Sequence, residues 1–500
     1  MPLLFPNQPR AFTMVFLLEL WERFGYYTVQ GVLTLFFIRY LGYSDHDSYF
    51  TFGAFSALVY GLVVFGGYLG DRVLGTKRTI ILGLIVLSCG YLSLAFTDKE
   101  HVFLALGLIC VGNGLFKANP SNLLSKCYEE NDPRLHSGFT LYYMSINLGS
   151  IVALTVGPAV ASHYGYSYTY LLSGIGLLLG LLNYYVQRHY VADINSEADK
   201  RRISFVHWLL VVIGVVLTAF ACSYLLQHIA LAKNLLSGIS LFAVLYYFYL
   251  MKGEHKSTVL KMMVAFALML QAVIFFTLYQ QMPTSLNLFA VHNVIPNIFG
   301  ITFDPQSFQA LNPIWIVLMS PLLAYAYTGL NKKGFLVAVP YKFALGMTLC
   351  GFSFLVLYFA RFFYTGNGMV SSWWLIASYL FQSLGELLVS ALGVAMVAEL
   401  VPPRITGFVM GLWFLTSAVA GFLGAEVAAF TSLPQNIHPG LESLQIYTHV
   451  FAGIGIVTLI ISLIMWIIAP LLSRYINTKE VVEKKDLESV AFSTTYIAGL

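Results

Sequence analysis

Residues 19–30 read ELWERFGYYTVQ and lie inside an apolar run that extends from residue 13 to residue 39. Such a run is long enough to cross a bilayer as a helix. Glu19 stands three and four positions before Glu22 and Arg23, so the three charges share one broad face of that helix. A charge inside a membrane helix costs about 2.5–3.5 kcal/mol even on lenient insertion scales. We therefore expect this face to line protein or water rather than lipid.

The composition of the whole chain is that of a membrane protein that crosses the bilayer many times. Of its 500 residues, 58% are hydrophobic and only 10% are charged, whereas soluble domains carry about 25% charged residues. The net charge is only +4 and the basic residues are scattered, which excludes a nucleic-acid-binding protein. The five cysteines lie mostly in apolar runs, so we expect no disulfide framework. We expect no cleavable signal peptide, because the first apolar run is long and contains charges.

Apolar runs of this length recur along the chain and predict an all-α polytopic membrane protein with 14 transmembrane helices, arranged as six, two and six. The expected spans are residues 13–39, 49–71, 79–97, 101–120, 138–162, 167–187, 205–227, 233–251, 259–290, 309–329, 342–361, 372–400, 405–431 and 446–472. The expected domains are an N-terminal six-helix bundle (1–188), a linker with two extra transmembrane helices (189–256), a C-terminal six-helix bundle (257–475) and a cytoplasmic tail (476–500).

The distribution of Lys and Arg sets the expected orientation. Of the 27 Lys and Arg residues, 21 lie in one alternate set of loops and tails and 4 in the opposite set, while Arg23 and Lys117 lie within spans. Positively charged loops stay on the cytoplasmic side, so we expect both termini in the cytoplasm.

Two loops at matching places in the two bundles resemble each other. Residues 67–78 read GYLGDRVLGTKR, and residues 329–334 read GLNKKG. Both are short, basic and bounded by glycine. Two six-helix halves related by an axis along the membrane normal are typical of transporters, with the substrate site between the halves at mid-depth. We expect the two middle helices, which hold no buried charge, to pack outside these halves.

Two further charges are predicted near the middle of spans, Lys117 in the first half and Glu386 in the second. One interpretation is that they only pair to let helices pack. The other is that a cation and an anion in opposite halves bind a zwitterion, with Lys117 and Arg23 holding its carboxylate and Glu386 its ammonium group. The buried carboxylates of Glu19 and Glu22 are in addition candidates for taking up a proton.

Several motifs in the spans are similar to those of one transporter family. ELWERFGYY (19–27), GNGLFK (112–117), FTLYYMSINLGS (139–150) and QSLGEL (382–387) resemble signatures of the proton-dependent oligopeptide transporters, a branch of the major facilitator superfamily. The loop at residues 67–78 resembles that superfamily's loop signature. Residues 279–285 (YQQMPTS) and 307–313 (SFQALNP) are most similar to bacterial dipeptide and tripeptide permeases, and the resemblance extends from about residue 10 to about residue 475.

The resemblance implies a proton-coupled symporter with the major facilitator fold that imports dipeptides and tripeptides by alternating access. It implies a multi-pass protein of the bacterial inner membrane, and we expect it to act as a monomer without metal or cofactor. The implied proton-coupling residues are Glu19, Glu22, Arg23, Lys117 and Glu386. The implied peptide-binding residues are Arg23 and Lys117 for the carboxylate, Asn147, Asn312 and Glu386 for the amino end and backbone, Tyr26, Tyr27, Tyr60, Trp413, Phe414 and Ser417 for side-chain pockets, and Gln30, Gln280 and Ser390 beside them.

The chain departs from the family pattern at two positions. Many members of the family have Arg where this chain has Gln30, and Glu where it has Gln280. The two changes resemble the joint replacement of an Arg–Glu pair by two neutral residues, because either charge left buried without the other would be costly. Proton coupling is therefore expected to depend on Glu19, Glu22 and Glu386.

Two other classes of function remain as alternatives. One is a major facilitator transporter of another small solute, such as a drug antiporter or a nitrate carrier, although such antiporters lack the opposed Lys117 and Glu386. The other is a membrane-embedded enzyme or haem protein. All eleven histidines lie in loops or near span ends, so the sequence offers no facing pair for a haem or metal at mid-membrane.

Overall fold

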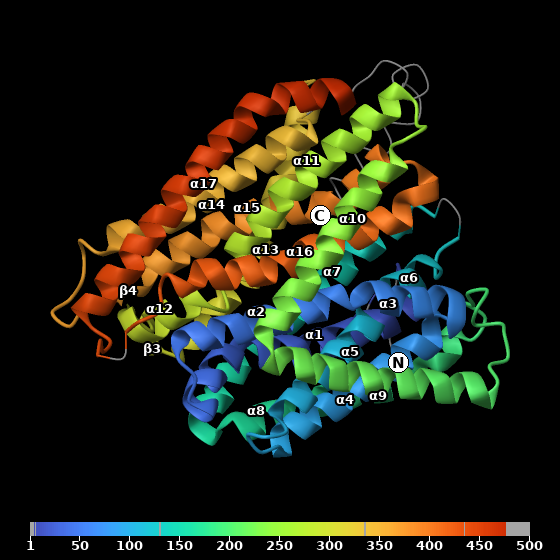
Figure 1. The fold of residues 1–500 in the computed structure, drawn as a ribbon, viewed down its shortest axis with the longest axis horizontal. Helices are drawn as coiled ribbons and strands as arrows, with labels where there is room; N and C mark the ends of the chain where they lie inside the picture. Colours follow the sequence, from blue (N-terminus) through green and yellow to red (C-terminus); the bar gives the residue numbers. More distant parts are fainter. Residues whose placement is uncertain (1–4, 6, 130–131, 335–336, 435, 477–500) are drawn as a thin grey trace. The chain divides into compact units, whose positions relative to one another are not determined.

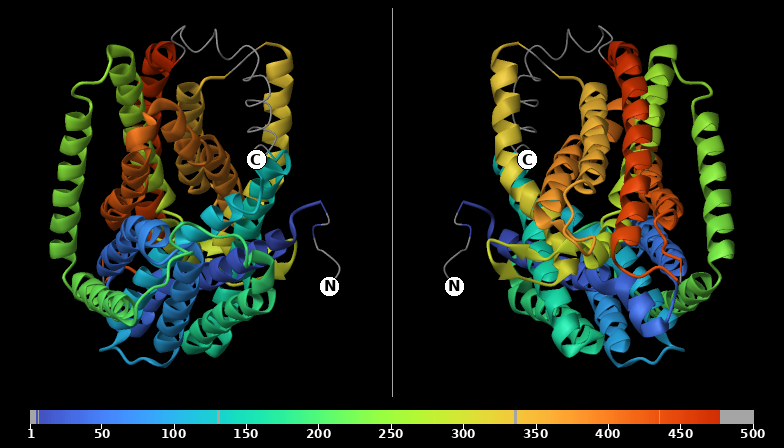
Figure 2. Two further views of the ribbon diagram at one scale, coloured as in Figure 1. Left: turned by 90° about the vertical axis from the view of Figure 1, so that its right-hand side faces the viewer. Right: turned by 90° about the vertical axis from the view of Figure 1, so that its left-hand side faces the viewer.

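The structure is a computed structural model that describes residues 5, 7–129, 132–334, 337–434 and 436–476. The chain forms two compact units, Met1–Lys233 and Asn234–Leu500. Within each unit the chain is built almost entirely from helices (Figure 2). The division between the units falls inside one of the two extra helices, so it differs from the predicted domain boundaries, which stay a prediction.

The first unit consists of helices and short helical turns. Its elements are α1 (Arg10–Phe36), the π-helical turn η1 (Phe37–Leu41), α2 (Asp45–Gly61), α3 (Val63–Tyr68), the π-helical turn η2 (Leu69–Val73), α4 (Thr76–Phe96), α5 (Val102–Lys117), α6 (Asn119–Ser125), α7 (Arg134–Tyr164), α8 (Tyr166–Gln187), the 3-10 turn η3 (Arg188–Val191) and α9 (Phe205–Gln227). Helix α10 (Ile229–Leu250) begins in this unit and continues into the second.

The second unit adds a few short strands. Its elements are α11 (Lys256–Tyr279), α12 (Ser285–Asn293), β1 (Val294–Ile295), β2 (Asn297–Ile298), β3 (Ile301–Thr302), η4 (Pro305–Ala310), α13 (Leu311–Lys332), α14 (Val339–Ala360), β4 (Val370–Ser371), α15 (Ser372–Leu400), η5 (Pro403–Ile405), α16 (Thr406–Ala429) and α17 (Leu441–Ile476). Strand β1 pairs in parallel with β4, and β2 pairs with β3 in an antiparallel hairpin. In Figure 1 these strands lie near α12, at one end of the unit's helices.

Every predicted span coincides with helix in the structure, and the fold class is confirmed. Three spans are interrupted: 49–71 is divided between α2, α3 and η2, 101–120 between α5 and α6, and 259–290 between α11 and α12. Pro120 at the start of α6 and Pro283 between α11 and α12 lack the N–H that would continue a helix. Within the described residues, twelve helices are long and apolar enough to cross a membrane; the total of fourteen stays a prediction.

Small residues let the helices of the first unit approach closely. Helix α1 packs on α7 and α8, and α4 packs on α5 and α8 (Figure 1). A Cβ at Gly149 of α7 would lie 2.6 Å from the carbonyl oxygen of Leu20 in α1, and a Cβ at Gly112 of α5 would lie 2.7 Å from the backbone nitrogen of Leu87 in α4. Close backbone contact of this kind drives helix association in lipid.

The contact between α3 and α5 gives a testable prediction about stability. A Cβ at Gly66 would overlap the backbone carbonyl of Gly114, which cannot move like a side chain. We expect Gly66→Ala to destabilise the purified protein by about 1–3 kcal/mol through overpacking. Gly61→Ala is the matched control, because a Cβ at Gly61 meets nothing within 4 Å. Thermal unfolding in detergent measures both variants, and equal melting temperatures would contradict the packing argument.

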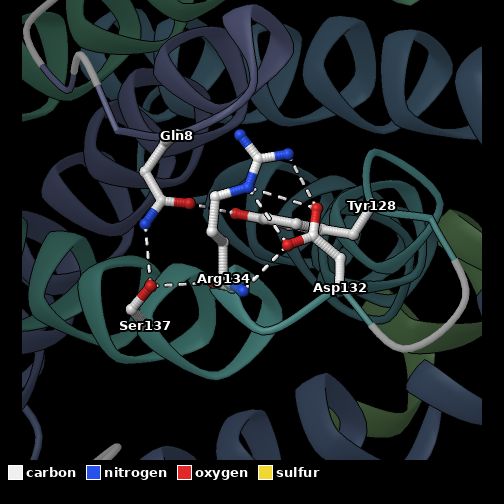
Figure 3. Close-up of polar contacts among 5 residues, drawn as sticks. All are labelled: Gln8, Tyr128, Asp132, Arg134 and Ser137. Carbon is white, nitrogen blue, oxygen red and sulfur yellow. Dashed lines mark hydrogen bonds and ion pairs between the residues drawn. The ribbon is translucent and has the colours of Figure 1, made fainter.

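A polar cluster ties the start of the chain to the segment between α6 and α7 (Figure 3). The hydroxyl of Tyr128 donates to Oε1 of Gln8 (2.8 Å), and Nε2 of Gln8 donates to Oγ of Ser137 (2.9 Å). Burial raises the pKa of the Tyr128 phenol, so it remains a donor. Beside it, Arg134 at the start of α7 pairs with Asp132 (Nη2 to Oδ2, 2.8 Å). These bonds fix the entry of the chain into α1.

The second unit has its own packed core. Helix α14 packs on α17 and α15, α11 packs on α16, and α13 packs on α15. Trp315 of α13 donates from Nε1 to the carbonyl oxygen of Ile376 in α15 (3.2 Å). Most side chains of α9 and α10 are exposed, as expected of helices that face lipid; their position outside both bundles stays a prediction.

Candidate functional site

The charged residues predicted on the first span form a compact ion cluster in α1. Arg23 Nε lies 2.5 Å from Glu22 Oε2 and 3.2 Å from Glu19 Oε1. The exposed fractions of Glu19, Glu22 and Arg23 are 3%, 0% and 4%. Buried charges within membrane-spanning helices are expensive, and they are usually paired and functional. The cluster carries two carboxylates against one guanidinium, so it has an excess of one negative charge when both acids are ionised.

Neutral donors from neighbouring helices complete the cluster. The hydroxyl of Tyr142 on α7 donates to Glu19 Oε2 (2.7 Å), and Nδ2 of Asn113 on α5 donates to Glu22 Oε1 (3.3 Å). Each carboxylate therefore has one partner that is charged and one that is not. Protonation of either acid would weaken its bond to Arg23 and leave Arg23 held by the other acid.

Lys117, the other cation predicted within a span of this unit, contacts an aromatic ring. It ends α5 half-buried, with its ammonium group 4.1 Å from the centre of the Tyr60 ring of α2. Among the residues that the structure describes, it forms no ion pair within 4.0 Å. A cation that contacts an aromatic face is stabilised without being neutralised. Lys117 therefore keeps its capacity to bind a carboxylate.

Aromatic residues continue the same face of α1. The guanidinium of Arg23 lies 5.4 Å from the centre of the Tyr26 ring, and the rings of Tyr26 and Tyr27 pack edge to face at 5.4 Å. Tyr27 and Gln30 are half-buried, whereas Tyr26 is buried. On α7, Asn147 is buried and donates from Nδ2 to the carbonyl oxygen of Tyr143, in its own helix (3.0 Å). By their spacing, the predicted Tyr26, Tyr27 and Gln30 share the broad face of α1 that carries the ion cluster.

In the second unit, Glu386 is the centre of a smaller polar group. Nδ2 of Asn312 on α13 donates to Glu386 Oε2 on α15 (2.7 Å) and to Oγ of Ser383 (3.1 Å). Glu386 is half-buried. Over the described part of the chain it forms no ion pair. The structure therefore brings together two of the predicted residues, Asn312 and Glu386, around a carboxylate that lacks a cation.

The remaining predicted residues of the second unit lie at the end of α11 and on α15 and α16. Trp413 of α16 is buried and packs edge to face on Phe276 of α11, with ring centres 5.8 Å apart. Gln280, at the end of α11, packs against Gly424 of α16, where a Cβ would lie 2.5 Å from the Gln280 Cβ. Ser390 and Phe414 are half-buried and Ser417 is buried. The roles assigned to all these residues stay predictions.

Three polar residues at the site were not assigned a role from the sequence: Asn113, Tyr142 and Ser383. Each lies in one of the motifs given above. Each also precedes a charged or polar residue of the same helix face by three or four positions. Asn113 precedes Lys117 by four, and Ser383 precedes Glu386 by three. That spacing is the signal that could have identified them.

Comparisons with known proteins show which family the chain resembles. The model of the POT family matches residues 77–450. Among curated proteins, the dipeptide and tripeptide permease B of Salmonella typhimurium is 50% identical over 474 residues, covering 94% of this chain and 97% of the relative. A permease of the same description from Aeromonas hydrophila is 49% identical over 486 residues, covering 97% of each chain.

Solved structures give the same result. The crystal structure of tetrameric PepTSo2 has a TM-score of 0.84 and 36% identity, and covers 93% of this chain and 99% of that chain. A structure of a bacterial homologue of the human drug peptide transporters PepT1 and PepT2 has a TM-score of 0.83 and 35% identity, with the same coverage. Both similarities include residues of the two units described above.

Proposed function

The chain belongs to the POT family, and from this premise we propose that it is a proton-coupled symporter that imports dipeptides and tripeptides by alternating access. The observation that carries the proposal is one half-buried cation and one half-buried anion, each without an ion-pair partner among the described residues. Lys117 in the first unit is a half-buried cation without an ion-pair partner among the described residues, and Glu386 in the second is a half-buried anion of the same kind. A zwitterion supplies the missing partner to each.

The peptide carboxylate is assigned to Lys117 and Arg23. Lys117 supplies a cation that is held by an aromatic ring, and Arg23 becomes more available when one acid of its cluster is protonated. The ammonium end is assigned to Glu386, whose Oε2 is oriented by Asn312. Charge-assisted hydrogen bonds of this type are roughly twice as strong as neutral ones.

In this proposal, the neutral residues bind the side chains and the backbone of the peptide. Tyr26, Tyr27 and Tyr60 offer aromatic surface beside the cations, and Trp413, Phe414 and Ser417 offer a mixed surface in the second unit. Asn147, Gln30, Gln280 and Ser390 carry amide or hydroxyl groups suited to a peptide backbone. A site that binds the two termini and the backbone accepts many side chains.

Proton coupling is assigned to the α1 cluster. Uptake of a proton by Glu19 or Glu22 removes the cluster's excess negative charge and loosens one carboxylate from Arg23. Arg23 stays paired with the other acid, and the N–H groups that this step releases bind the peptide carboxylate, so proton and peptide load together. The bond from Tyr142 to Glu19 and the bond from Asn113 to Glu22 keep each acid in place while its charge changes.

Competition for uptake of a labelled dipeptide into proteoliposomes tests the substrate class. We expect unlabelled dipeptides and tripeptides to compete and amino acids and tetrapeptides to fail. A dipeptide acetylated at its amino end and amidated at its carboxyl end should compete at least tenfold more weakly, because it forms neither charge-assisted bond. Equal competition by the blocked dipeptide would contradict the assignment, and exchange of a drug or of nitrate instead would favour the alternative transporters.

The membrane orientation and the assembly state are further parts of the proposal. The multi-pass chain belongs in a bacterial inner membrane, with both termini in the cytoplasm as the Lys and Arg distribution indicates. A fluorescent protein fused after Leu500 should fluoresce, since such fusions mature only in the cytoplasm. We propose that a single chain is the functional unit, although one solved relative is tetrameric. Light scattering with transport at matched protein density tests this point, and transport that requires tetramers would contradict it.

A further inference from the structure

Two cavities of opposite character meet at η2 in the first unit. An apolar groove of about 570 Å³ lies between α3, α5 and α9, and Leu69 and Val73 of η2 face it. A polar cavity of about 600 Å³ lies on the other side of the same turn, where Asp71 and Arg72 face it. The residues of η2 thus separate the apolar groove from the polar cavity. An amphiphile binds to such a pair of sites with its apolar chain in one and its polar head in the other.

The groove has the length of one membrane leaflet. On α9 it extends from His207 to Thr218, which is about 16 Å at 1.5 Å per residue. One leaflet of a bilayer has about 15 Å of hydrocarbon. Gly214 lies midway along this stretch, where a Cβ would meet nothing within 4 Å. The groove therefore has open space for an acyl chain along the first half of α9.

The polar cavity has an excess of available positive charge. Arg72, Lys126 and Arg201 line it, and no ion pair of these three occurs among the described residues. Asp71 and Glu197 also line the cavity, so its lining residues carry a net charge of one positive unit. Glu197 is in addition paired with Lys200 (2.9 Å), while Asp71 accepts from the neutral Nδ2 of Asn122 (2.7 Å) and keeps its charge. The cavity is complementary to an anion, and a phosphate diester is the anion that carries an acyl chain into a membrane groove.

The wall of the cavity is rigid, because the linker segment (residues 188–204) is bonded to the start of α4. Nζ of Lys77 donates to the carbonyl oxygen of Val191 (3.0 Å) and to Oδ1 of Asn195 (2.8 Å). Asp199 is buried and accepts from the backbone N–H of Lys77. It sits against Gly75, whose φ of 91° and lack of a Cβ permit the approach. A preformed wall lowers the entropic cost of binding.

We propose that the first unit binds one anionic phospholipid, with an acyl chain in the groove between α3, α5 and α9 and the phosphate in the cavity lined by Arg72, Lys126 and Arg201. In the orientation proposed above, this lipid belongs to the cytoplasmic leaflet. The bound lipid joins the extra helix α9 to the six-helix bundle, beyond the direct packing of α9 on α5.

Native mass spectrometry of the full chain in detergent tests the proposal by titration with phosphatidylglycerol and with phosphatidylcholine of the same chains. We expect one phosphatidylglycerol to bind about tenfold more tightly than phosphatidylcholine, since phosphatidylcholine carries a compensating cation. Equal affinity for the two lipids would overturn the proposal. Inorganic phosphate is the third probe, and displacement of the lipid by an equal concentration of phosphate would show a free-anion site instead.

Two pairs of variants locate the lipid. Arg201→Gln should weaken phosphatidylglycerol binding about tenfold, whereas Arg202→Gln should not, since Arg202 is exposed and is not part of the cavity lining. Gly214→Leu should fill the groove and weaken binding by a similar factor, whereas Gly238→Leu on α10 should not; a Cβ meets nothing within 4 Å at either glycine. Equal effects within either pair would overturn the proposal, and the readout does not depend on transport.

Discussion

Replacing Glu22 with glutamine is expected to abolish proton-driven concentration of peptide, and Glu19→Gln should do the same. Both substitutions keep the shape of the side chain but remove the site that takes up the proton. Arg23 then loses a charged partner permanently, because an amide oxygen attracts it far less than a carboxylate. The measurement is accumulation of a labelled dipeptide in proteoliposomes with an imposed proton gradient and membrane potential.

The size of the effect follows from the driving force. One proton that crosses a potential of about 150 mV supplies ~3.5 kcal/mol, at 2.3 kcal/mol per 100 mV. That energy supports accumulation of a neutral peptide by a few hundredfold. A variant without a coupling site should equilibrate the peptide at a ratio of about one. Counterflow exchange, which needs no net movement of protons, should survive in part, and it separates loss of coupling from loss of folding.

Glu100→Gln is the matched control for these variants. Glu100 is an exposed acid in the segment before α5, so its replacement removes the same charge without changing the cluster. It should concentrate peptide normally. If both Glu19→Gln and Glu22→Gln also concentrate peptide at the normal level, the α1 cluster is not the coupling site. Glu386 would then be the next acid to test, because Gln280 leaves α11 without one.

The positions of the helices could be predicted from the sequence, because long apolar runs form the helices and polar segments separate them. The span predicted at 205–227 coincides with α9 at both ends, and the span at 372–400 coincides with α15. The breaks inside three spans were missed, since apolar content does not change where a proline or a π-helical turn redirects a helix. The spacing of Glu19, Glu22 and Arg23 predicted their shared face, and the structure adds their distances.

The partners of the charges were harder to predict, because they come from other helices. Tyr142 reaches Glu19 from α7, 123 positions along the chain, and Asn312 reaches Glu386 from α13, 74 positions away. Periodicity along one helix gives the face of a residue but not its neighbour across a helix interface. For the same reason, neither the ring of Tyr60 beside Lys117 nor the cavities at η2 could be inferred from the sequence.

The second large effect concerns the two charges that lack ion-pair partners in the described part of the chain. Lys117→Gln should weaken binding of a free dipeptide by roughly tenfold to a hundredfold, because a charge-assisted hydrogen bond contributes ~1.5–3 kcal/mol. Glu386→Gln should weaken it by a similar factor. Isothermal titration or competition for uptake gives the affinities, provided each variant melts at the temperature of the parent protein.

Blocked peptides distinguish a contact with the peptide terminus from a general loss of site structure. If Lys117 binds the carboxylate, then amidating the peptide's carboxyl end should lower its affinity for the parent protein. The same amidation should change its affinity for Lys117→Gln very little. Acetylating the amino end should still weaken binding to Lys117→Gln. Glu386→Gln should show the opposite pattern. Such double-mutant cycles isolate the coupling between one residue and one terminus.

Lys99→Gln is the matched control, because Lys99 also contacts a tyrosine ring, that of Tyr40, but is exposed in a loop. Additive losses for Lys117→Gln and the amidated peptide would mean that the lysine acts on the shape of the site, and that the carboxylate is bound by Arg23 alone.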